Sequence, residues 1–459
     1  MLSSKPPQKM SLRISNAQKP VPPGPKILLT ATNRWPVGAR VAVALSRMGC
    51  NVAAICPMPG HPIQKVKALQ QTFHYSGFHP LKSVRKAIDA FDPDIVIPSC
   101  DRGVQHLLEL HAVAQSEGAS GKRIAALIER SLGAPESFPV VLSRYELLRV
   151  ARAEGILVPD MVAIHDAADL KQWSAQTPPP WVIKADGTWG GRGVRVAATE
   201  VAAQRYLVEL SRPAGMLELI KRLTLNRDRG WIFLDFMNSR PGVIAQSHID
   251  GRPANCAVVC WQGKLLAGIG VEVVRADGPK DPASVVQVVD SPDMMAAAER
   301  IARRLKLSGL FGLDFMIENA TGATYLIEMN PRCTPPCPLP LGKGRDLMAA
   351  MWAQLVGQPV PENQPVTQKN RIAYFPQTWG SSSDLPNSSP LETIYHDIPD
   401  GEPELIQELL HPWSERSLLG QAFDGVRRNK TQKKAVCVFE CQSASIKPDH
   451  AEQATTSQG

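Results

Sequence analysis

The first third of the chain alternates short apolar runs with amphipathic segments. The apolar runs are typical of buried strands, and the segments between them carry apolar residues at helical spacing. Strands are expected at Lys26–Ala31, Asn51–Cys56 and Asp94–Pro98, and helices at Val37–Met48 and Leu81–Phe91. Strands that alternate with helices favour crossover connections and parallel pairing. The pattern therefore predicts an α/β fold class with a small parallel-sheet domain over residues 25–135.

Polar residues follow the ends of these expected strands. Ligands of parallel sheets gather at the carboxyl ends of the strands. This rule nominates Thr32, Asn33, Arg34, Ser99, Asp101 and Arg102 as candidate ligand contacts. Each of them is equally suited to a helix cap or a loop, and capping is the favoured role for Thr32 and Asn33.

A second pattern lies between Gly312 and Arg332, where apolar residues alternate with polar ones around a glycine-containing turn. The alternation predicts a β-hairpin in which Glu328 and Asn330 share one face, with Asp314 beside them on the other strand. Two carboxylates and an amide oxygen suit magnesium held jointly with nucleotide phosphates. A hairpin with acidic residues facing water is the alternative, but the apolar neighbours favour a buried sheet with a site on one face.

A glycine-dense loop forms a third pattern, between an apolar strand that ends near Lys184 and a strand that begins at Val194. Glycines allow the backbone N–H groups to approach phosphate oxygens closely. Lys184 adds a positive charge, and Arg192 can close over the phosphates. No Gly-Lys-Ser/Thr follows, so the P-loop motif does not fit. A flexible hairpin loop is the alternative. The loop glycines are Gly187, Gly190, Gly191 and Gly193.

In this order the two elements resemble the ATP-grasp superfamily, in particular its carboxylate–amine ligases and carbamoyl phosphate synthetase-like members. The resemblance covers about residues 139–361 and begins at Ser143–Pro159, which is similar to the family's helix leading to Gly-Ile-x-x-Pro. It implies two α+β subdomains that clamp ATP, with a lid subdomain at about 178–248. The parallel-sheet domain before them then corresponds to the family's Rossmann-like N-terminal domain.

The resemblance also implies roles for individual residues. It assigns nucleotide binding to Arg144, Lys184, Gly187, Gly190, Gly191, Gly193, Gln246, His248 and Ile249, metal binding to Asp314, Glu328 and Asn330, and catalytic roles to Lys184, Arg192 and Arg332. Two features depart from the family pattern. Ser247 stands where the family usually has glutamate, and a proline-rich stretch at 333–340 follows Arg332 where an acceptor often docks. We interpret the second as a feature of the substrate site.

The implied activity is an ATP- and magnesium-dependent ligation, with manganese as an alternative metal. A small-molecule carboxylate would become an acyl phosphate, and an amine or another nucleophile would displace phosphate. Two alternatives remain open: a phosphotransferase that releases its phosphorylated product, and a non-catalytic nucleotide-binding regulatory protein. Homodimer formation is also left open.

Length and composition add further expectations. A chain of 459 residues suggests about three domains. No apolar run reaches the roughly 18 residues that span a bilayer, and no signal-peptide core is present, so a cytoplasmic protein without a membrane partner is expected. The nine cysteines are an odd number, which argues against a complete disulfide framework. The pairs Cys256/Cys260, Cys333/Cys337 and Cys437/Cys441 share one spacing, for which buried free thiols are favoured over a zinc site.

The formal charge of +8 comes largely from the ends of the chain. Basic residues near the N-terminus and at 427–434 raise the question of nucleic-acid binding, but the aromatic interleaving typical of such surfaces is missing. We therefore expect no nucleic-acid partner. Residues 1–24 and 442–459 are expected to be disordered, although the first segment also lacks acids as transit peptides do.

The segment 362–441 is expected to form a C-terminal cap. A strand is predicted at Arg371–Pro376, and short helical segments are predicted at His396–Pro403 and Leu405–Leu410.

Overall fold

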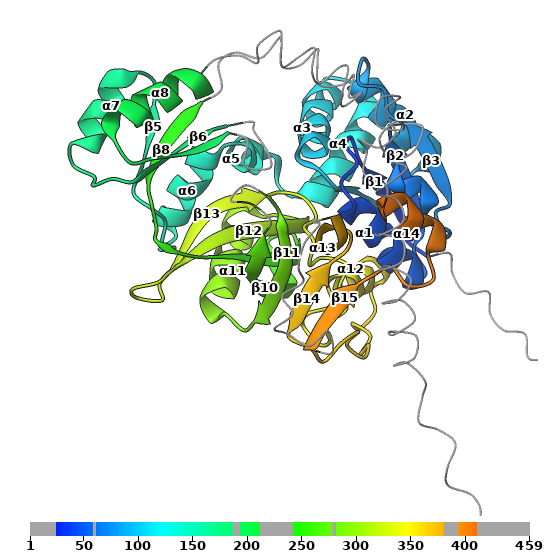
Figure 1. Ribbon diagram of the computed structural model, residues 1–459. Helices are drawn as coiled ribbons and strands as arrows, with labels where there is room; N and C mark the ends of the chain where they lie inside the picture. Colours follow the sequence, from blue (N-terminus) through cyan, green and yellow to red (C-terminus); the bar gives the residue numbers. More distant parts are fainter. Residues whose placement is uncertain are drawn as a thin grey trace, which may run out of the picture.

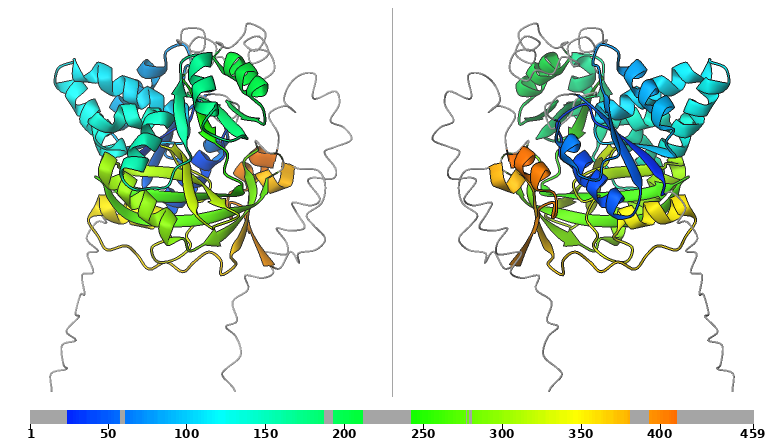
Figure 2. Two further views of the ribbon diagram at one scale, coloured as in Figure 1. Left: turned by 90° about the vertical axis from the view of Figure 1, so that its left-hand side faces the viewer. Right: turned by 90° about the vertical axis from the view of Figure 1, so that its right-hand side faces the viewer.

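The computed structural model describes residues 24–57, 61–186, 193–211, 242–276, 278, 281–380 and 393–410 (Figure 1). These residues form three sheets with helices packed against them. Figure 2 shows the largest sheet running beneath the other two sheets and their helices. Within the described part of the chain, no helix is both long and apolar enough to cross a bilayer.

The N-terminal domain is a parallel sheet in the order β3-β2-β1-β4. Its strands are β1 (Lys26–Thr30), β2 (Asn51–Cys56), β3 (Gln71–His74) and β4 (Ile95–Pro98), and its helices are α1 (Val37–Arg47), α2 (Pro80–Phe91), α3 (Asp101–Gln115) and α4 (Ala119–Leu132). The three predicted strands and two predicted helices are confirmed. β3 was not predicted, because this edge strand contains no fully buried residue and so has no apolar run.

A four-stranded antiparallel sheet follows, in the order β5-β8-β6-β7. Its strands are β5 (Met161–Ile164), β6 (Trp181–Ala185), β7 (Val194–Ala197) and β8 (Val243–Ser247), and α7 (Ala167–Ser174) and α8 (Glu200–Leu210) pack on it. The strand ending near Lys184 and the strand beginning at Val194 are as predicted. β5 precedes residue 178, so the sheet extends upstream of the lid boundary that the sequence suggests.

The central sheet has seven strands in the order β13-β12-β9-β10-β11-β14-β15. They are β9 (Gly251–Trp261), β10 (Lys264–Ala276), β11 (Ala283–Val289), β12 (Gly309–Glu318), β13 (Thr324–Asn330), β14 (Arg371–Tyr374) and β15 (Ile394–Asp397). The helices α6 (Arg144–Ala153), α11 (Pro292–Leu305) and α12 (Leu347–Val356) pack against it.

β9 is apolar along most of its length because both of its faces are buried. Ala257 and Val259 belong to one core, which also contains residues of β1, β2, α1 and α12. Val258 and Cys260 belong to a second core, with residues of α6 and α11. Because successive strand residues point to opposite faces, this one strand joins the central sheet to the N-terminal domain on one side and to α11 on the other.

The C-terminal described segment returns to the central sheet and to the N-terminal domain. The strand predicted at Arg371–Pro376 is confirmed as β14, and α14 (Pro403–Leu410) is the second of the two predicted helical segments. The helix predicted at His396–Pro403 is wrong: His396 lies in β15, which pairs in parallel with β14. Backbone pairing with β14 therefore outweighed the helical pattern of residues 396–403.

Ion pairs tie this C-terminal segment to the N-terminal domain. They are Arg34–Glu408, Arg40–Asp397 and Lys65–Glu404. The Arg40–Asp397 pair is buried, so its charges are screened little by solvent. The C-terminal segment therefore holds α1 and the loop after β1 in place.

All seven cysteines within the described ranges are buried free thiols. Cys256 and Cys260 share a face of β9, as their spacing predicts, and belong to the same apolar core. Among the described positions, no three or more His, Cys, Asp and Glu side chains form a group suited to a metal. Cys437, Cys441, the basic run at 427–434 and both predicted tails, apart from Gly24, lie outside the described residues.

His61 is a buried neutral imidazole beneath the loop that follows β1. Its side chain is 2% exposed. Nε2 donates to the Asn33 carbonyl at 2.6 Å, and Nδ1 accepts from the backbone N–H of Ile63 at 3.2 Å. Protonation would place a second N–H against a donor. Burial, as the main cause, lowers the pKa of His61 to about 4 from 6.5.

We expect the free energy of unfolding to fall as the pH drops from 6.5 towards 4, because unfolded His61 takes up a proton in that range and folded His61 does not. The shift corresponds to about 3 kcal/mol. Urea titrations of the wild type and of His61→Gln, above and below this window, would measure the effect. The variant should lose part of the pH dependence, whereas His165→Gln, at an exposed histidine, should keep it. Equal pH dependence in the wild type and His61→Gln would contradict the prediction.

Candidate functional site

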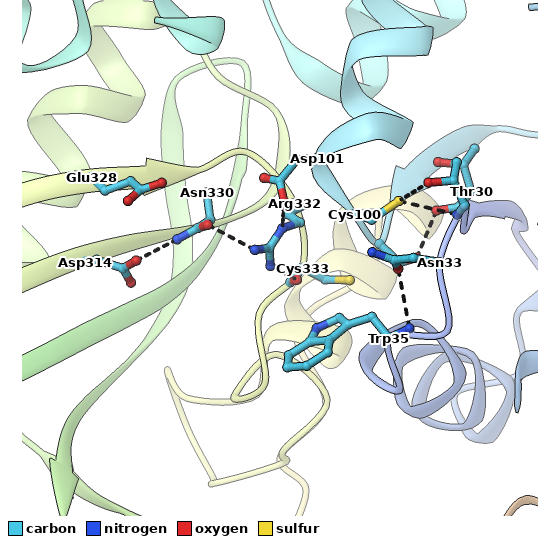
Figure 3. A network of polar contacts seen from close by, with 12 residues as sticks. Thr30, Asn33, Trp35, Cys100, Asp101, Asp314, Glu328, Asn330, Arg332 and Cys333 are labelled. Carbon is cyan, nitrogen blue, oxygen red and sulfur yellow. Dashed lines mark hydrogen bonds and ion pairs between the residues drawn. The ribbon is translucent and has the colours of Figure 1, made fainter. Parts of the chain in front are cut away.

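The predicted hairpin is present and brings the proposed metal ligands together. Asp314 of β12 pairs directly with Glu328 of β13, and the register shifts between Asp314 and Phe315. Asn330, two residues after Glu328, donates through Nδ2 to Asp314 Oδ2 at 2.8 Å. The oxygen-bearing side chains therefore lie on one face of the hairpin (Figure 3).

The carboxylates of Asp314 and Glu328 repel each other in the hairpin. Burial, and then the nearby charge of Glu328, raise the pKa of Asp314 to about 6 from 3.8. Hydrogen bonds from the amides of Asn255 and Asn330 partly offset this increase. A divalent cation would relieve the repulsion, and carboxylate and amide oxygens are its preferred ligands. The residues present therefore fit magnesium.

Two basic residues meet the hairpin from the neighbouring elements. Arg144, the first residue of α6, forms an ion pair with Glu328 at 2.8 Å, and its guanidinium also donates to the Ala185 carbonyl. Lys184 of β6 is 4% exposed and donates to the Ile327 carbonyl at 3.3 Å. Burial, as the largest cause, lowers the pKa of Lys184 to about 8. Both residues predicted to bind the nucleotide thus lie beside the predicted metal ligands.

The start of α6 is fixed by an aspartate that the sequence did not single out. The Ser143 side chain accepts from the backbone N–H of Glu146 and caps the helix. Asp186, next to Ala185, accepts from the backbone N–H of Arg144 at 3.3 Å and from Ser143 Oγ at 3.4 Å. Burial raises the pKa of Asp186, and the charge of Arg144 opposes that increase. These contacts position Arg144 against the hairpin.

The glycine loop is described only at its ends. The backbone N–H of Ala185 donates to the Gly193 carbonyl at 2.9 Å, which closes the base of the loop. Gly187, Gly190, Gly191 and Arg192 lie outside the described residues, and their roles stay predictions.

The segment expected to pass the adenine edge runs along β8. Gln246 is buried, and its Nε2 has no hydrogen-bond partner among the described residues. Ser247, in place of the usual glutamate, exchanges hydrogen bonds with the backbone of Asp160. The His248 backbone N–H donates to the Pro180 carbonyl. That N–H is therefore already engaged, and Gln246 supplies an uncommitted polar group on this strand. Ile249 follows, partly buried.

Arg332 links the hairpin to the N-terminal domain. Its Nε donates to Asp101 Oδ2 at 2.8 Å, its Nη2 to Asn330 Oδ1 at 3.1 Å and its Nη1 to the Cys333 carbonyl at 3.3 Å (Figure 3). Asp101, nominated from its place after β4, is the first residue of α3. An ion pair and a shared amide thus connect Asp101, at a strand end of one domain, to the predicted metal ligands of another.

The other candidates at the strand ends form contacts that stabilise the fold. Asn33 Oδ1 accepts from the backbone N–H of Trp35, Ser99 donates to the Thr30 carbonyl, and Thr32 contacts Cys100 Sγ. Arg34 pairs with Glu408, and Arg102 is buried in the first turn of α3. Of this set, Asp101 is the residue with a hydrogen bond to Arg332.

Asn255 is a site residue that the sequence analysis missed. It donates to Asp314 Oδ1 and to the Leu313 carbonyl, the latter at 3.2 Å. The signal available was a single amide within the otherwise apolar stretch Ala254–Trp261 of β9. Gly312 makes room beside it, because a Cβ there would lie 2.5 Å from Cγ2 of Thr334. The loop after Arg332 therefore packs directly on the hairpin.

A family model for the ATP-grasp domain matches residues 229–336, which include the hairpin. The chain has the ATP-grasp fold. Solved ATP-grasp structures share its arrangement. The ADP complex of an N5-carboxyaminoimidazole ribonucleotide synthetase has a TM-score of 0.52 and 14% identity, and the match covers 75% of this chain and 80% of that one. A search of the curated proteins finds no significant match.

Two biotin carboxylase structures are similar over a comparable length. The biotin carboxylase domain of Hydrogenobacter thermophilus 2-oxoglutarate carboxylase, a dimer with MgADP, ADP and bicarbonate, has a TM-score of 0.51 and 15% identity, covering 74% of this chain and 71% of that one. Campylobacter jejuni biotin carboxylase has a TM-score of 0.52 and 15% identity, covering 73% and 72%. At these identities the likeness shows the fold, and the ATP-grasp fold expected from the sequence is confirmed.

The Arg144–Glu328 pair should stabilise the ligand-free protein. A cycle of Arg144→Met, Glu328→Gln and the double variant, followed by urea unfolding without magnesium or nucleotide, should give a coupling energy of about 1.5–3 kcal/mol, because the pair is charged and mostly buried. The same cycle on Arg123–Asp89, whose side chains are 45% and 44% exposed, should give less than about 1 kcal/mol. Equal coupling energies for the two pairs would contradict this account.

Proposed function

We propose that this ATP-grasp protein is an ATP- and magnesium-dependent ligase that joins a small-molecule carboxylate to an amine or another nucleophile. The observation that carries the proposal is the meeting of Asp314, Glu328 and Asn330 with Arg144 and Lys184. Oxygen ligands for a metal and positive charges for phosphates are the two requirements of phosphoryl transfer from ATP.

The carboxylate of the substrate would attack the γ-phosphorus of ATP. The bond from that phosphorus to the β,γ-bridging oxygen would break, and ADP would leave with the electron pair. The products of this step are an acyl phosphate and ADP. The amine would then attack the acyl carbon and displace phosphate, with loss of a proton from the nitrogen. Because an acyl phosphate is already activated, the second step needs little general-base assistance.

The residues of the chain would act mainly by charge and position. Asp314, Glu328 and Asn330 would hold magnesium, which supplies charge neutralisation at the phosphates. Phosphate oxygens next to Lys184 would raise its pKa again, because a nearby anion favours the protonated form. Arg332, within hydrogen-bonding distance of Asn330, would bind the carboxylate next to the metal ligands. Fixed charges of this kind stabilise a transition state without reorganisation.

The similar structures support ATP as the nucleotide. They are complexes with ADP for the ribonucleotide synthetase, and with MgADP, ADP and bicarbonate for the carboxylase domain. Bicarbonate therefore belongs among the carboxylates to test. Manganese remains an alternative to magnesium within the same proposal.

Removal of either carboxylate charge should abolish metal-dependent turnover. We expect Asp314→Asn and Glu328→Gln each to lower magnesium-dependent ADP formation by about 100-fold or more. Glu318→Gln is the matched control, because Glu318 lies on the same strand and bonds to Thr321 in the hairpin turn. Calorimetric titration with magnesium and a non-hydrolysable ATP analogue would separate lost binding from lost chemistry. Unchanged turnover in both site variants would show that the ligands are assigned wrongly.

Hydroxylamine capture tests the acyl phosphate directly. With pooled carboxylates, ATP and magnesium, we expect hydroxamate to form in step with ADP. A stable phosphoester would instead identify a phosphotransferase. Nucleotide binding without ADP formation across broad acid and amine pools would support a regulatory protein.

A further inference from the structure

The Asp101–Arg332 ion pair has unused hydrogen-bonding capacity on both sides. An arginine carries five N–H donors. Among the described residues Arg332 commits three of them, to Asp101, Asn330 and the Cys333 carbonyl. Asp101 accepts through Oδ2 from Arg332, and Oδ1 has no partner within the described part of the chain. Two N–H donors and one carboxylate oxygen are therefore left for a ligand.

The pair is reachable and lies beside an aromatic wall. The side chains of Arg332 and Asp101 are 17% and 16% exposed, so neither is sealed in the protein. Trp35, in the loop after β1, points its indole ring towards Arg332 and Cys333 from the N-terminal domain (Figure 3). The indole Nε1 is buried without a partner among the described residues. An apolar surface with one free donor thus adjoins the ion pair.

The negative charge of Asp101 and the positive charge of Arg332 indicate which class of ligand can bind. A simple carboxylate bound to Arg332 would place a second negative charge beside Asp101, and a simple amine bound to Asp101 would place a second positive charge beside Arg332. Both of these like-charge contacts are unfavourable. A molecule that carries a carboxylate and an ammonium group avoids them, because each group contacts the residue of opposite charge. The two residues are 2.8 Å apart at their closest atoms, so the two ligand groups must be close neighbours, as they are in an α-amino acid.

We propose that Asp101 and Arg332 together bind an α-amino acid, with its carboxylate on Arg332, its ammonium on Asp101 and its side chain along Trp35. This inference rests on the proposed function and names the carboxylate substrate of the ligase. The contact of Arg332 with Asn330 places the amino-acid carboxylate next to the metal ligands. The carboxylate is therefore the group that receives the phosphoryl group, and Asp101 is a specificity-determining residue.

The test compares ligands on the wild-type protein first. Each of the common L-amino acids is titrated calorimetrically with magnesium and a non-hydrolysable ATP analogue present. Each one that binds is then compared with its des-amino carboxylate and its decarboxylated amine. We expect the amino acid to bind about tenfold to a hundredfold more tightly than either analogue, because each analogue places a like charge beside Asp101 or Arg332 without the opposite charge that compensates for it.

The variant Asp101→Asn should remove this preference. We expect it to weaken amino-acid binding at least about tenfold and to leave binding of the des-amino carboxylate unchanged or tighter. Asp89→Asn, which removes the same charge from the ion pair between Asp89 of α2 and Arg123 of α4, should change neither affinity. Circular dichroism and Tm identify a variant that fails to fold, and Asp101→Glu, which keeps the charge, should retain the preference for the amino acid.

Three results would overturn the inference. They are equal binding of the amino acid and its des-amino analogue, equal weakening of both ligands by Asp101→Asn, and binding by none of the amino acids. ADP formation with bicarbonate or another carboxylate, in the absence of amino-acid binding, would refute this inference and leave the proposed ligase intact. Amino-acid binding with the expected preference but without ADP formation would support the inference and refute the ligase.

Discussion

The structure of the site depends on one unfavourable contact, the placement of two acidic side chains opposite each other on a buried hairpin. Asp314 and Glu328 face one another across β12 and β13, and the raised pKa of Asp314 records the resulting repulsion and loss of water. Their neighbours compensate for it. Arg144 pairs with Glu328, and the amides of Asn255 and Asn330 donate to Asp314. A charge that is buried and unpaired is far less favourable than one with partners.

The same compensation extends into the N-terminal domain and fixes how the domains are joined. Asn330 bonds to Arg332, and Arg332 bonds to Asp101 at the start of α3. Beneath this polar connection, β1, β2 and α1 share a continuous apolar core with β9 and α12. A shared core restricts relative motion of the domains more than a polar contact does, because separation would expose apolar surface. The strand ends of the first sheet therefore stay next to the hairpin.

The sequence predicted the elements whose signals are local. The alternation around Glu328 and Asn330 predicted the hairpin face, and the glycine-rich segment after Lys184 predicted a strand before the loop and another after it. The contacts that complete the site join residues far apart in the chain. Arg332 and Asp101 are separated by 231 positions, and Arg144 and Glu328 by 184. The spacing of apolar and polar residues along the chain does not predict which distant side chains pair. β15 was missed because its parallel pairing with β14, in which Arg371 lies beside Ile394, outweighed the local pattern.

These pairings also explain how a site rich in buried charge remains stable before any ligand arrives. Arg144 would contribute to phosphate binding, and it is held meanwhile by Glu328; Arg332 would bind a carboxylate, and it is held by Asp101. A phosphate bound to Arg144 would therefore replace one internal partner by an external one of the same sign, whereas a carboxylate on Arg332 would use the donors that are not committed to Asp101. The net change in buried charge is then small, and so is the desolvation that binding must overcome. Because a ligand group must carry the charge opposite to that of the residue it contacts, the charged pairs that stabilise the site also determine which ligands can bind there.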